Sequence, residues 1–331
     1  MFGIRFCGKC DRFSESLSRT NLKRTLRFRF FFQVGFLSCE PDEAYVAVLS
    51  QDGKEILVAR DVQSVFERKE TKYRLSADQY RAILDALEGR LAPDAHGSTV
   101  VKSAYFDTEQ RDMVARSLEK PFYKEKLRVR GYGIVGKDDT VFVEIKKKYD
   151  GVVYKRRIGM SYAAARAYLD GMPYEKACRA FPAKEESQIA CASHEEEVQV
   201  AREVDALASR WGAPSASVVT SCVRTAYGPI GEDGYGCSGE DGLRITFDSS
   251  LAYCDLRAKR RASSFLPLIG PEEVIMEIKV RGSYPKWLAD VLAQCNAYPC
   301  SFSKYGEAYK RCMQRCSKPV DSKREAVAVC A

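Results

Sequence analysis

The chain has 331 residues, of which 45% are hydrophobic and 30% charged, and this balance is typical of a globular protein with one large domain or two ordinary ones. Its formal net charge of +8 favours polyanionic partners such as nucleotides, polyphosphate, nucleic acid or an anionic membrane surface. Only two histidines are present, His96 and His194, which argues against histidine-based zinc chemistry and Ser/His/Asp triads, and the 13 cysteines lack the regular spacing of a disulfide framework.

The first part of the chain, residues 1–63, is basic and then aromatic, without clear periodicity. We expect a basic extension, partly disordered, with one hairpin formed by residues 45–49 and 55–59 around Asp52-Gly53. No stretch reaches the roughly 18 apolar residues that span a bilayer, and no signal-peptide cleavage site is evident. We therefore expect a cytoplasmic protein with reduced thiols.

From residue 64 to residue 316 strands and helices interleave, and residues 317–331 are expected to form a tail. Short turns between strands, such as the Gly- and Asp-rich segment 133–139, favour a mainly antiparallel sheet. The expected strands are 65–74, 102–107, 124–132, 140–148, 152–158, 218–227, 243–247 and 275–280, and the expected helices are 77–91, 109–113, 162–171, 194–207, 285–297 and 303–316.

Lysine and arginine recur at every second residue on several of these strands, with a glutamate among them. Residues i and i+2 of a strand point to the same side, so each set lies on one face. One such strand would indicate only a half-solvated sheet, and residues 155–157 fit that interpretation equally well. Several strands together predict the lining of one anionic site, and the clearest sets are Arg68, Glu70 and Lys72; Arg128 and Arg130; Glu144, Lys146 and Lys148; and Glu277, Lys279 and Arg281.

If the charged faces all point inward, the sheet must close or be covered on its apolar face. We therefore predict an α+β fold, a closed antiparallel β-barrel of about eight strands that forms a tunnel, with helices packed outside.

Phosphoryl transfer needs cations around the phosphates and a divalent metal held by carboxylates. The arginines offer forked donors and the lysines point charges, while glutamates suit hard cations such as Mg²⁺ or Mn²⁺. Glu277 is the strongest metal candidate, followed by Glu144 and Glu70. Asp107 and Asp248 are interpreted as turn or strand-end residues.

Several segments, in this order, resemble the VTC catalytic domain of polyphosphate polymerases, within the triphosphate tunnel metalloenzymes. The resemblance covers roughly residues 64–310, and it depends on the ordered combination rather than on any one motif. The segments are FERKETKY (66–73), SAYFDT (103–108), LRVRGYG (127–133), VFVEIKKK (141–148), CVRTAYG (222–228), LRITFD (243–248), MEIK (276–279) and FSKY (302–305).

The resemblance implies a tunnel whose basic side chains hold a triphosphate or polyphosphate and whose glutamate, Glu277, holds the metal. Arg68 stands where the broader superfamily has the first glutamate of Glu-x-Glu-x-Lys, which fits the VTC branch and weakens a hydrolase interpretation. The matching catalytic and phosphate-binding positions are Lys72, Arg128, Arg130, Arg224, Arg244 and Lys304, with Lys146, Arg157 and Lys279 as further phosphate ligands.

Three functions remain open at this point. The first is a metal-dependent transferase that moves the terminal phosphate of ATP onto a growing polyphosphate chain. The second is a tripolyphosphate or polyphosphate hydrolase, and the third is a noncatalytic polyphosphate-binding module. A separate membrane protein is a candidate partner, whereas nucleic acid is not expected, because carboxylates among the cations would repel its backbone.

Overall fold

The fold is described from a computed structural model that defines the backbone of residues 36–40, 43–49 and 55–59 and of residues 68–150, 152–184, 194–231, 242–258 and 265–316. The chain divides into two units, residues 1–66 and 67–331. Within the smaller unit, β1 (Phe36–Glu40), β2 (Glu43–Leu49) and β3 (Glu55–Ala59) form an antiparallel sheet. The predicted hairpin is confirmed, because Tyr45 pairs with Ala59 and Leu49 with Glu55.

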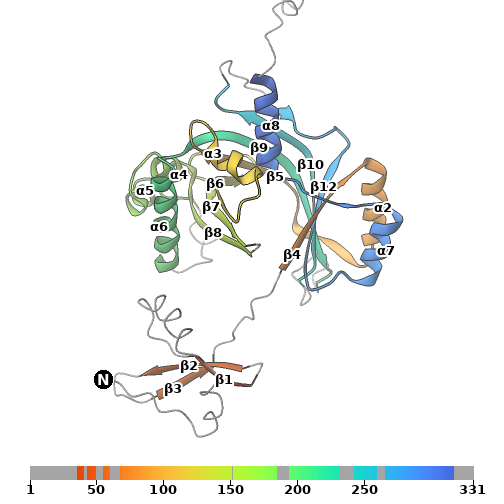
Figure 1. Ribbon diagram of the computed structural model, residues 1–331, viewed down its shortest axis with the longest axis horizontal. Helices are drawn as coiled ribbons and strands as arrows, with labels where there is room; N and C mark the ends of the chain where they lie inside the picture. The colour runs from red at the N-terminus through yellow and green to blue at the C-terminus, as the bar shows by residue number, and fades with distance from the viewer. Residues whose placement is uncertain are drawn as a thin grey trace, which may run out of the picture. The chain divides into compact units, whose positions relative to one another are not determined.

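Eight strands of eight to 17 residues form the frame of the larger unit, as Figure 1 shows. They belong to a ten-stranded antiparallel sheet with the order β13-β4-β12-β10-β9-β5-β6-β7-β8, in which the short β11 (Leu266–Pro267) pairs with β10 and β13 (Pro299–Cys300) with β4. The long strands are β4 (Arg68–Leu75), β5 (Leu91–Asp107), β6 (Tyr123–Tyr132), β7 (Thr140–Tyr149), β8 (Val152–Ser161), β9 (Ser215–Pro229), β10 (Arg244–Asp255) and β12 (Val274–Arg281).

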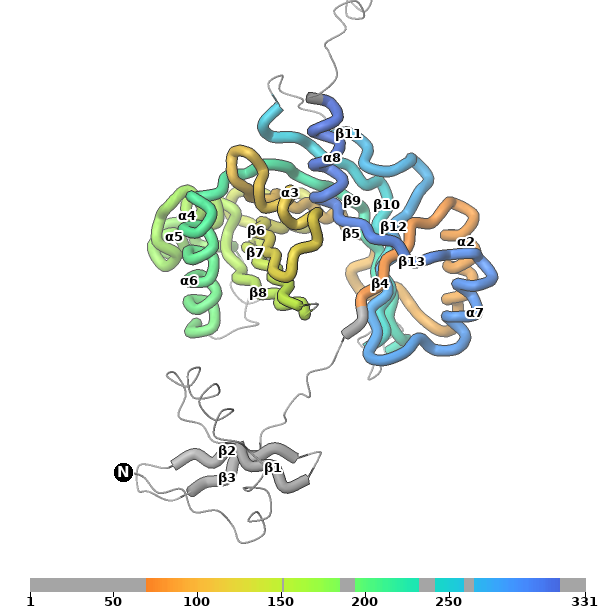
Figure 2. Tube along the Cα trace, viewed as in Figure 1, coloured from red at the N-terminus to blue at the C-terminus, as the bar shows by residue number. Residues whose placement is uncertain are grey.

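Seven helices are defined in the described residues, and the connections between them can be followed in Figure 2. Ser76 caps the first of them with a capping box that includes Gln79, and Ser161 caps α4 through the amide of Ala164. The proposed cap of α6 at Ser193 lies outside the described residues. The helices are α2 (Ala77–Leu87), α3 (Asp112–Leu118), α4 (Tyr162–Leu169), α5 (Tyr174–Ala180), α6 (His194–Arg210), α7 (Lys286–Gln294) and α8 (Lys304–Cys316). None of the described helices combines the length and the apolar character needed to cross a bilayer.

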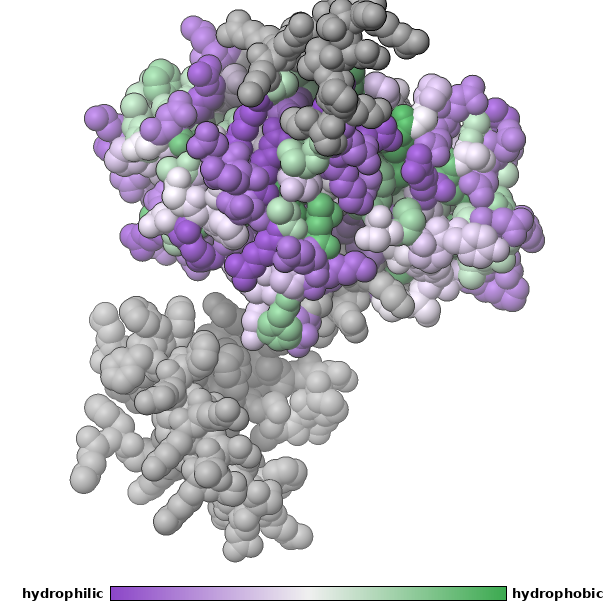
Figure 3. Space-filling model, turned by 45° about the horizontal axis from the view of Figure 1, so that its top comes forward, coloured by the Kyte–Doolittle hydropathy of each residue, from purple (hydrophilic) through white to green (hydrophobic). Residues whose placement is uncertain are grey.

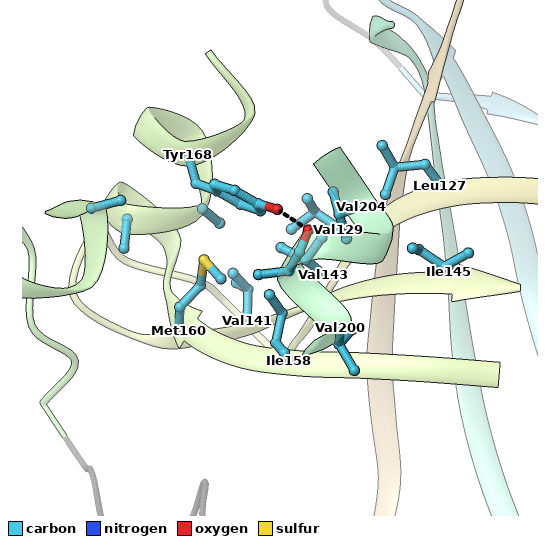
Figure 4. Close-up of a cluster of buried hydrophobic side chains, with 14 of the residues drawn as sticks. Leu127, Val129, Val141, Val143, Ile145, Ile158, Met160, Tyr168, Val200 and Val204 are labelled. Atoms are coloured by element: carbon cyan, nitrogen blue, oxygen red, sulfur yellow. Dashed lines mark hydrogen bonds between the residues drawn. The ribbon is translucent and has the colours of Figure 1, made fainter. Parts of the chain in front are cut away.

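The helices bury the apolar face of the sheet in three clusters. In the first, Leu127 and Val129 of β6 and Ile145 of β7 pack beneath α4, α5 and α6, where the hydroxyl of Tyr168 donates to the carbonyl of Ala201 (Figure 4). A second cluster joins β4, β10 and β12 to α2 and α7, and a third joins β5, β9 and β10 to α3 and α8. In the first two clusters, burial of the apolar face by the hydrophobic effect leaves the alternate, charged residues of each strand on the opposite face. In the third cluster, Val101, Tyr105 and Cys222 lie on the same face as those charged residues.

The sheet is curled but open, so the predicted closed barrel is not confirmed. Among the described residues, β8 is hydrogen-bonded only to β7, and the opposite end of the sheet is the two-residue β13. Side chains rather than a backbone ladder connect the two ends. Lys146 of β7 lies 4.0 Å from Glu70 of β4, and Lys126 of β6 donates to Ser303, just before α8, at 3.0 Å.

Candidate functional site

A cavity of about 530 Å³ lies on the charged face of the sheet. Residues of β4, β5, β6, β7, β8, β9 and β12 contribute to it, together with the segment before α8 and Lys304 at the start of that helix. Its charge is strongly unbalanced. Hydrophilic residues also cover much of the face of the molecule that Figure 3 shows. The cations are Lys72, Lys124, Lys126, Arg128, Arg130, Lys146, Lys148, Lys155, Arg224, Lys279 and Lys304, against the three glutamates Glu70, Glu144 and Glu277.

Glu144 on β7 orients two arginines of the neighbouring strand. Its side chain is 1% exposed, and Oε2 lies 2.6 Å from Nε of Arg128 and 3.8 Å from Nε of Arg130, while Oε1 lies 2.8 Å from Nζ of Lys155. Burial alone would raise the pKa of Glu144, but the fields of these three cations outweigh it and lower the pKa to about 2. This carboxylate is therefore ionised and holds both guanidinium groups at the cavity wall.

Asp248 on β10 orients two other cations of the cavity, Arg224 and Lys304. It accepts two parallel hydrogen bonds of 2.7 Å from Arg224, and it accepts a further bond from Lys304. Although burial opposes its charge, Lys304 and Arg224 hold the pKa of Asp248 well below its usual range. Its side chain is buried beneath the two cations, so Asp248 is a counter-ion rather than the strand-end residue that we expected.

Glu277 on β12 lies opposite Lys72 of β4 in the strand register. Its Oε1 is 2.5 Å from Nζ of Lys279, and its Oε2 is 3.6 Å from Nζ of Lys72, which also contacts Glu70 at 3.3 Å. Burial would raise the pKa of Glu277, but Lys279, Lys72 and Arg224 lower it to about 2. Glu277 is thus an ionised oxygen donor that lines the cavity.

The carboxylates that line the cavity decide whether a divalent cation would fit there. The described part of the chain has no group of three or more His, Cys, Asp or Glu residues arranged to hold a metal by themselves. Magnesium at phosphoryl sites is usually held by one or two carboxylates, and its other ligands are phosphate oxygens and water. Glu277 and Glu70, which both contact Lys72, offer the one or two carboxylates that this kind of magnesium binding needs.

Lysines dominate the part of the cavity formed by β6, β7 and β8. Lys126 is opposite Lys146 in the register, and Lys124 is opposite Lys148. Burial, in each case the largest cause, lowers the pKa values of Lys126, Lys146 and Lys155, and that of Lys126 falls to about 8. Crowded and partly dehydrated ammonium groups are favourable sites for a polyanion, because a bound anion removes their mutual repulsion.

Tyr105 on β5 completes the wall. Its hydroxyl accepts a hydrogen bond of 3.3 Å from Arg128, and its ring stacks on Tyr305 with 4.5 Å between centroids. Burial would raise the pKa of Tyr105, but Arg128, Arg130 and Lys126 lower it to about 8. The hydroxyl of Tyr305 in turn donates to Asp107, which accepts from the amides of Met113 and Val114 in α3.

Most of the predicted site residues meet in this cavity, but Arg68 and Arg281 of the alternating sets, and two of the predicted phosphate ligands, do not line it. Arg244 pairs with Asp94 at 2.7 Å, and Arg157 lies over the ring of Phe142 at 4.8 Å from its centroid. Their phosphate-binding function stays a prediction. The residues that we missed are Lys124, Lys126, Lys155 and Tyr105. The lysines could have been found, since all three continue the alternation of predicted site residues on β6 and β8.

A model of the VTC domain matches residues 67–313. No curated protein matches the sequence. Among solved structures, a putative adenylyl cyclase from Hippeastrum, described as having a dominant triphosphatase activity, is 15% identical, with a TM-score of 0.41 over 73% of this chain and 95% of its own.

Two further structures are more distant. A putative adenylate cyclase from Vibrio parahaemolyticus is 12% identical with a TM-score of 0.35, over 73% of this chain and 97% of its own. The Mediator head module of Schizosaccharomyces pombe includes a chain that is 7% identical with a TM-score of 0.31, over 69% of this chain and 90% of its own. Scores this low carry no functional argument, whereas the domain model covers most of the sequence, from β4 to α8. The chain therefore belongs to the VTC domain family.

Proposed function

We propose that this protein is a metal-dependent polyphosphate polymerase, which transfers the terminal phosphate of ATP to a growing polyphosphate chain within the basic cavity. Membership of the VTC domain family supports an enzymatic activity on polyphosphate or triphosphate. The observation that carries the proposal further is the surplus of cations in the cavity, where eleven lysines and arginines face three glutamates. That surplus exceeds what one triphosphate with its own metal ion needs, and it suits a longer polyanion.

Transfer directly from donor to acceptor agrees with the raised thiol pKa values of Cys222 and Cys300, the two cysteines among the described residues that line the cavity. Neither His96 nor His194 is among the residues that line it. Cys222 lines the cavity, but burial, with the nearby Asp248, raises the pKa of its thiol to about 11, so the thiol is protonated and weakly nucleophilic at neutral pH. Positioning and electrostatic stabilisation are then the main contributions of the protein, as is general for phosphoryl transfer.

The charged residues of the cavity have different parts in the proposed reaction. Arg128, Arg130 and Arg224 bind phosphate oxygens through forked donors, already oriented by Glu144 and Asp248. Lys72 and Lys279 supply point charges around Glu277, Lys304 supplies one beside Asp248, and Lys126 and Lys146 hold the rest of the polymer. Glu277 would hold Mn²⁺ or Mg²⁺, and the bound ion would neutralise charge that develops on the transferring phosphoryl group. We place the reaction in the cytoplasm, where ATP is the donor.

The variant Glu277→Gln tests this proposal. It keeps the shape of the side chain but removes the charge that attracts a divalent ion, so ATP turnover should fall by about 10²-fold or more while triphosphate still binds to the basic wall. The measurement is product formation from ATP and Mn²⁺, together with titration of triphosphate without metal.

Glu273→Gln is the matched control. Glu273 lies just before β12 and pairs with Arg74 at 2.6 Å, outside the residues that line the cavity. Its replacement should leave turnover unchanged. Normal turnover in Glu277→Gln would remove the metal assignment, and equal losses in both variants would indicate damage to β12 rather than to a metal site.

A further inference from the structure

A group of apolar side chains lies exposed at one end of β6, β7 and β8. Phe122, Tyr149, Val152, Val153 and Tyr154 are each between 49% and 61% exposed. We call this group the aromatic tip. Single exposed apolar residues are normal, but five of them at one end of a sheet need an explanation.

The strand pairing holds the members of the tip together. Tyr149 is opposite Val152 in the register, and the rings of Phe122 and Tyr149 pack edge to face with 4.7 Å between centroids. The amide of Asp150 donates to the carbonyl of Phe122 at 3.1 Å, which holds the end of β7 beside the start of β6. The two rings thus pack on each other, and none of the five residues belongs to the three buried clusters.

Lysines surround the aromatic tip. Lys148 is opposite Val153 on β8 and opposite Lys124 on β6. Burial lowers the pKa of Lys124, and Lys148, Lys120 and Lys146 lower it further, so these cations lie close enough to repel one another. Among the described residues, no carboxylate lies within ion-pair distance of Lys120, Lys124 or Lys148.

Other charges at this end do not cancel the lysines. Glu119 and Asp150 are exposed carboxylates next to Lys120 and Tyr149 in the sequence. On the outer side of the hairpin, Lys147 and Arg156 share one carboxylate, that of Glu203, at 2.7 and 3.7 Å. The tip is therefore apolar at its end and basic around it.

We propose that the aromatic tip docks on the surface of an anionic lipid bilayer. Exposed aromatic and aliphatic side chains insert at the level of the headgroups, where tyrosine is favoured, and the unpaired lysines bind anionic headgroups. A nucleic acid would match the lysines but not the valines of the tip. Lys148 and Val153 also line the cavity. Docking of the aromatic tip would therefore place this part of the cavity next to the membrane surface.

The experiment uses the full chain and vesicles of phosphatidylcholine with or without 30% phosphatidylserine. We expect sedimentation with the anionic vesicles only, weakened by salt. The double variant Phe122→Ser, Tyr154→Ser, whose residues do not line the cavity, should lower the partition coefficient by about tenfold or more. Tyr298→Ser is the matched control, since Tyr298 is 73% exposed but lies beside β13, and it should bind as the wild type does.

A site-specific readout separates the tip from other basic parts of the chain. Tyr154→Trp should gain fluorescence that brominated lipids quench, and Tyr298→Trp should gain fluorescence that they do not. Absence of binding, equal binding by the double variant, or no quenching of the new tryptophan would each overturn the proposal. None of these measurements depends on ATP turnover, so they stand or fall separately from the proposed polymerase activity.

Discussion

Replacing Glu144 with glutamine should weaken the fold and at the same time make the protein respond more strongly to triphosphate. Glu144 is the buried counter-ion of Arg128, Arg130 and Lys155, and its pKa falls from 4.5 to about 2. That shift corresponds to about 3 kcal/mol of stability at neutral pH. Removal of one partner from buried ion pairs typically costs about 3–5 kcal/mol, which agrees with this value.

The sign of the pH dependence follows from the direction of the shift. Because the folded-state pKa lies below the unfolded value, the contribution is complete above about pH 5 and is lost as the pH falls through about 2. The stability difference between wild type and Glu144→Gln should thus be about 3 kcal/mol at pH 7 and less than half of that at pH 3. At about 2–4 °C per kcal/mol, the melting temperature at pH 7 should fall by about 6–12 °C.

Triphosphate should restore part of this loss, because its oxygens replace the missing charge beside Arg128 and Arg130. The assay is thermal and urea denaturation with and without triphosphate, and the control is Glu203→Gln. Glu203 also pairs with two cations, Lys147 and Arg156, but its side chain is 26% exposed and lies outside the cavity. The control should lose less than about 1 kcal/mol and gain no more from triphosphate than the wild type does. A pH-independent loss in Glu144→Gln, or equal ligand responses in both variants, would refute the reasoning.

Three other predictions concern binding and domain structure. Arg128→Ala and Arg130→Ala should each weaken triphosphate binding by about 1.5–3 kcal/mol in calorimetry, and wild-type affinity in both variants would remove these arginines from the binding site. Polyphosphate affinity should fall as the pH rises through about 8, because the pair Lys126 and Tyr105 then loses a proton; a flat profile for the wild type would contradict these assignments. A chain that starts at Ser64 should melt at the same temperature and bind triphosphate equally well, and loss of either property would show that residues 1–63 support the larger unit.

The sequence predicted every long strand of the larger unit. Charged and apolar residues alternate along most of these strands, because one face of the strand lines the cavity and the other packs in the core. Leu127 and Val129 are in the core, and Arg128 and Arg130 line the cavity, as the alternation required. The strand ends were less predictable. Strand β5 continues back to Leu91 through Pro93 and Gly97, which read as turn residues, and an irregularity in the pairing between Pro93 and Ser98 accommodates them.

Irregular pairing also explains why the strand predicted at residues 243–247 is shorter than β10, which runs from Arg244 to Asp255. Ser250 has a positive φ of 49°, and the register shifts between Ser249 and Ala252, after which the strand continues to Asp255. A bulge of this kind depends on long-range pairing and has no clear local signal. Helix α5 was also missed, because its seven residues provide too short a period for recognition.

At the site, cation positions were easier to predict than their partners. Alternation identifies which residues share a face, but it does not say which carboxylate lies beneath which arginine. The functions of Asp248 and Glu144 as buried counter-ions depend on pairing between β9 and β10 and between β6 and β7, at Asp248↔Arg224 and Arg128↔Glu144. The closed barrel failed for a related reason, since face patterning predicts curvature but not whether the end strands come within hydrogen-bonding distance.

The most direct test of the central claim is the chain length of the products that the purified protein makes from ATP with Mn²⁺ or Mg²⁺. The proposed polymerase predicts ADP and phosphate chains that lengthen with time, and a chelator should stop their formation. Release of orthophosphate alone would contradict it in favour of hydrolysis. Tight binding of polyphosphate without turnover under either metal would contradict enzymatic activity and leave a polyphosphate-binding module.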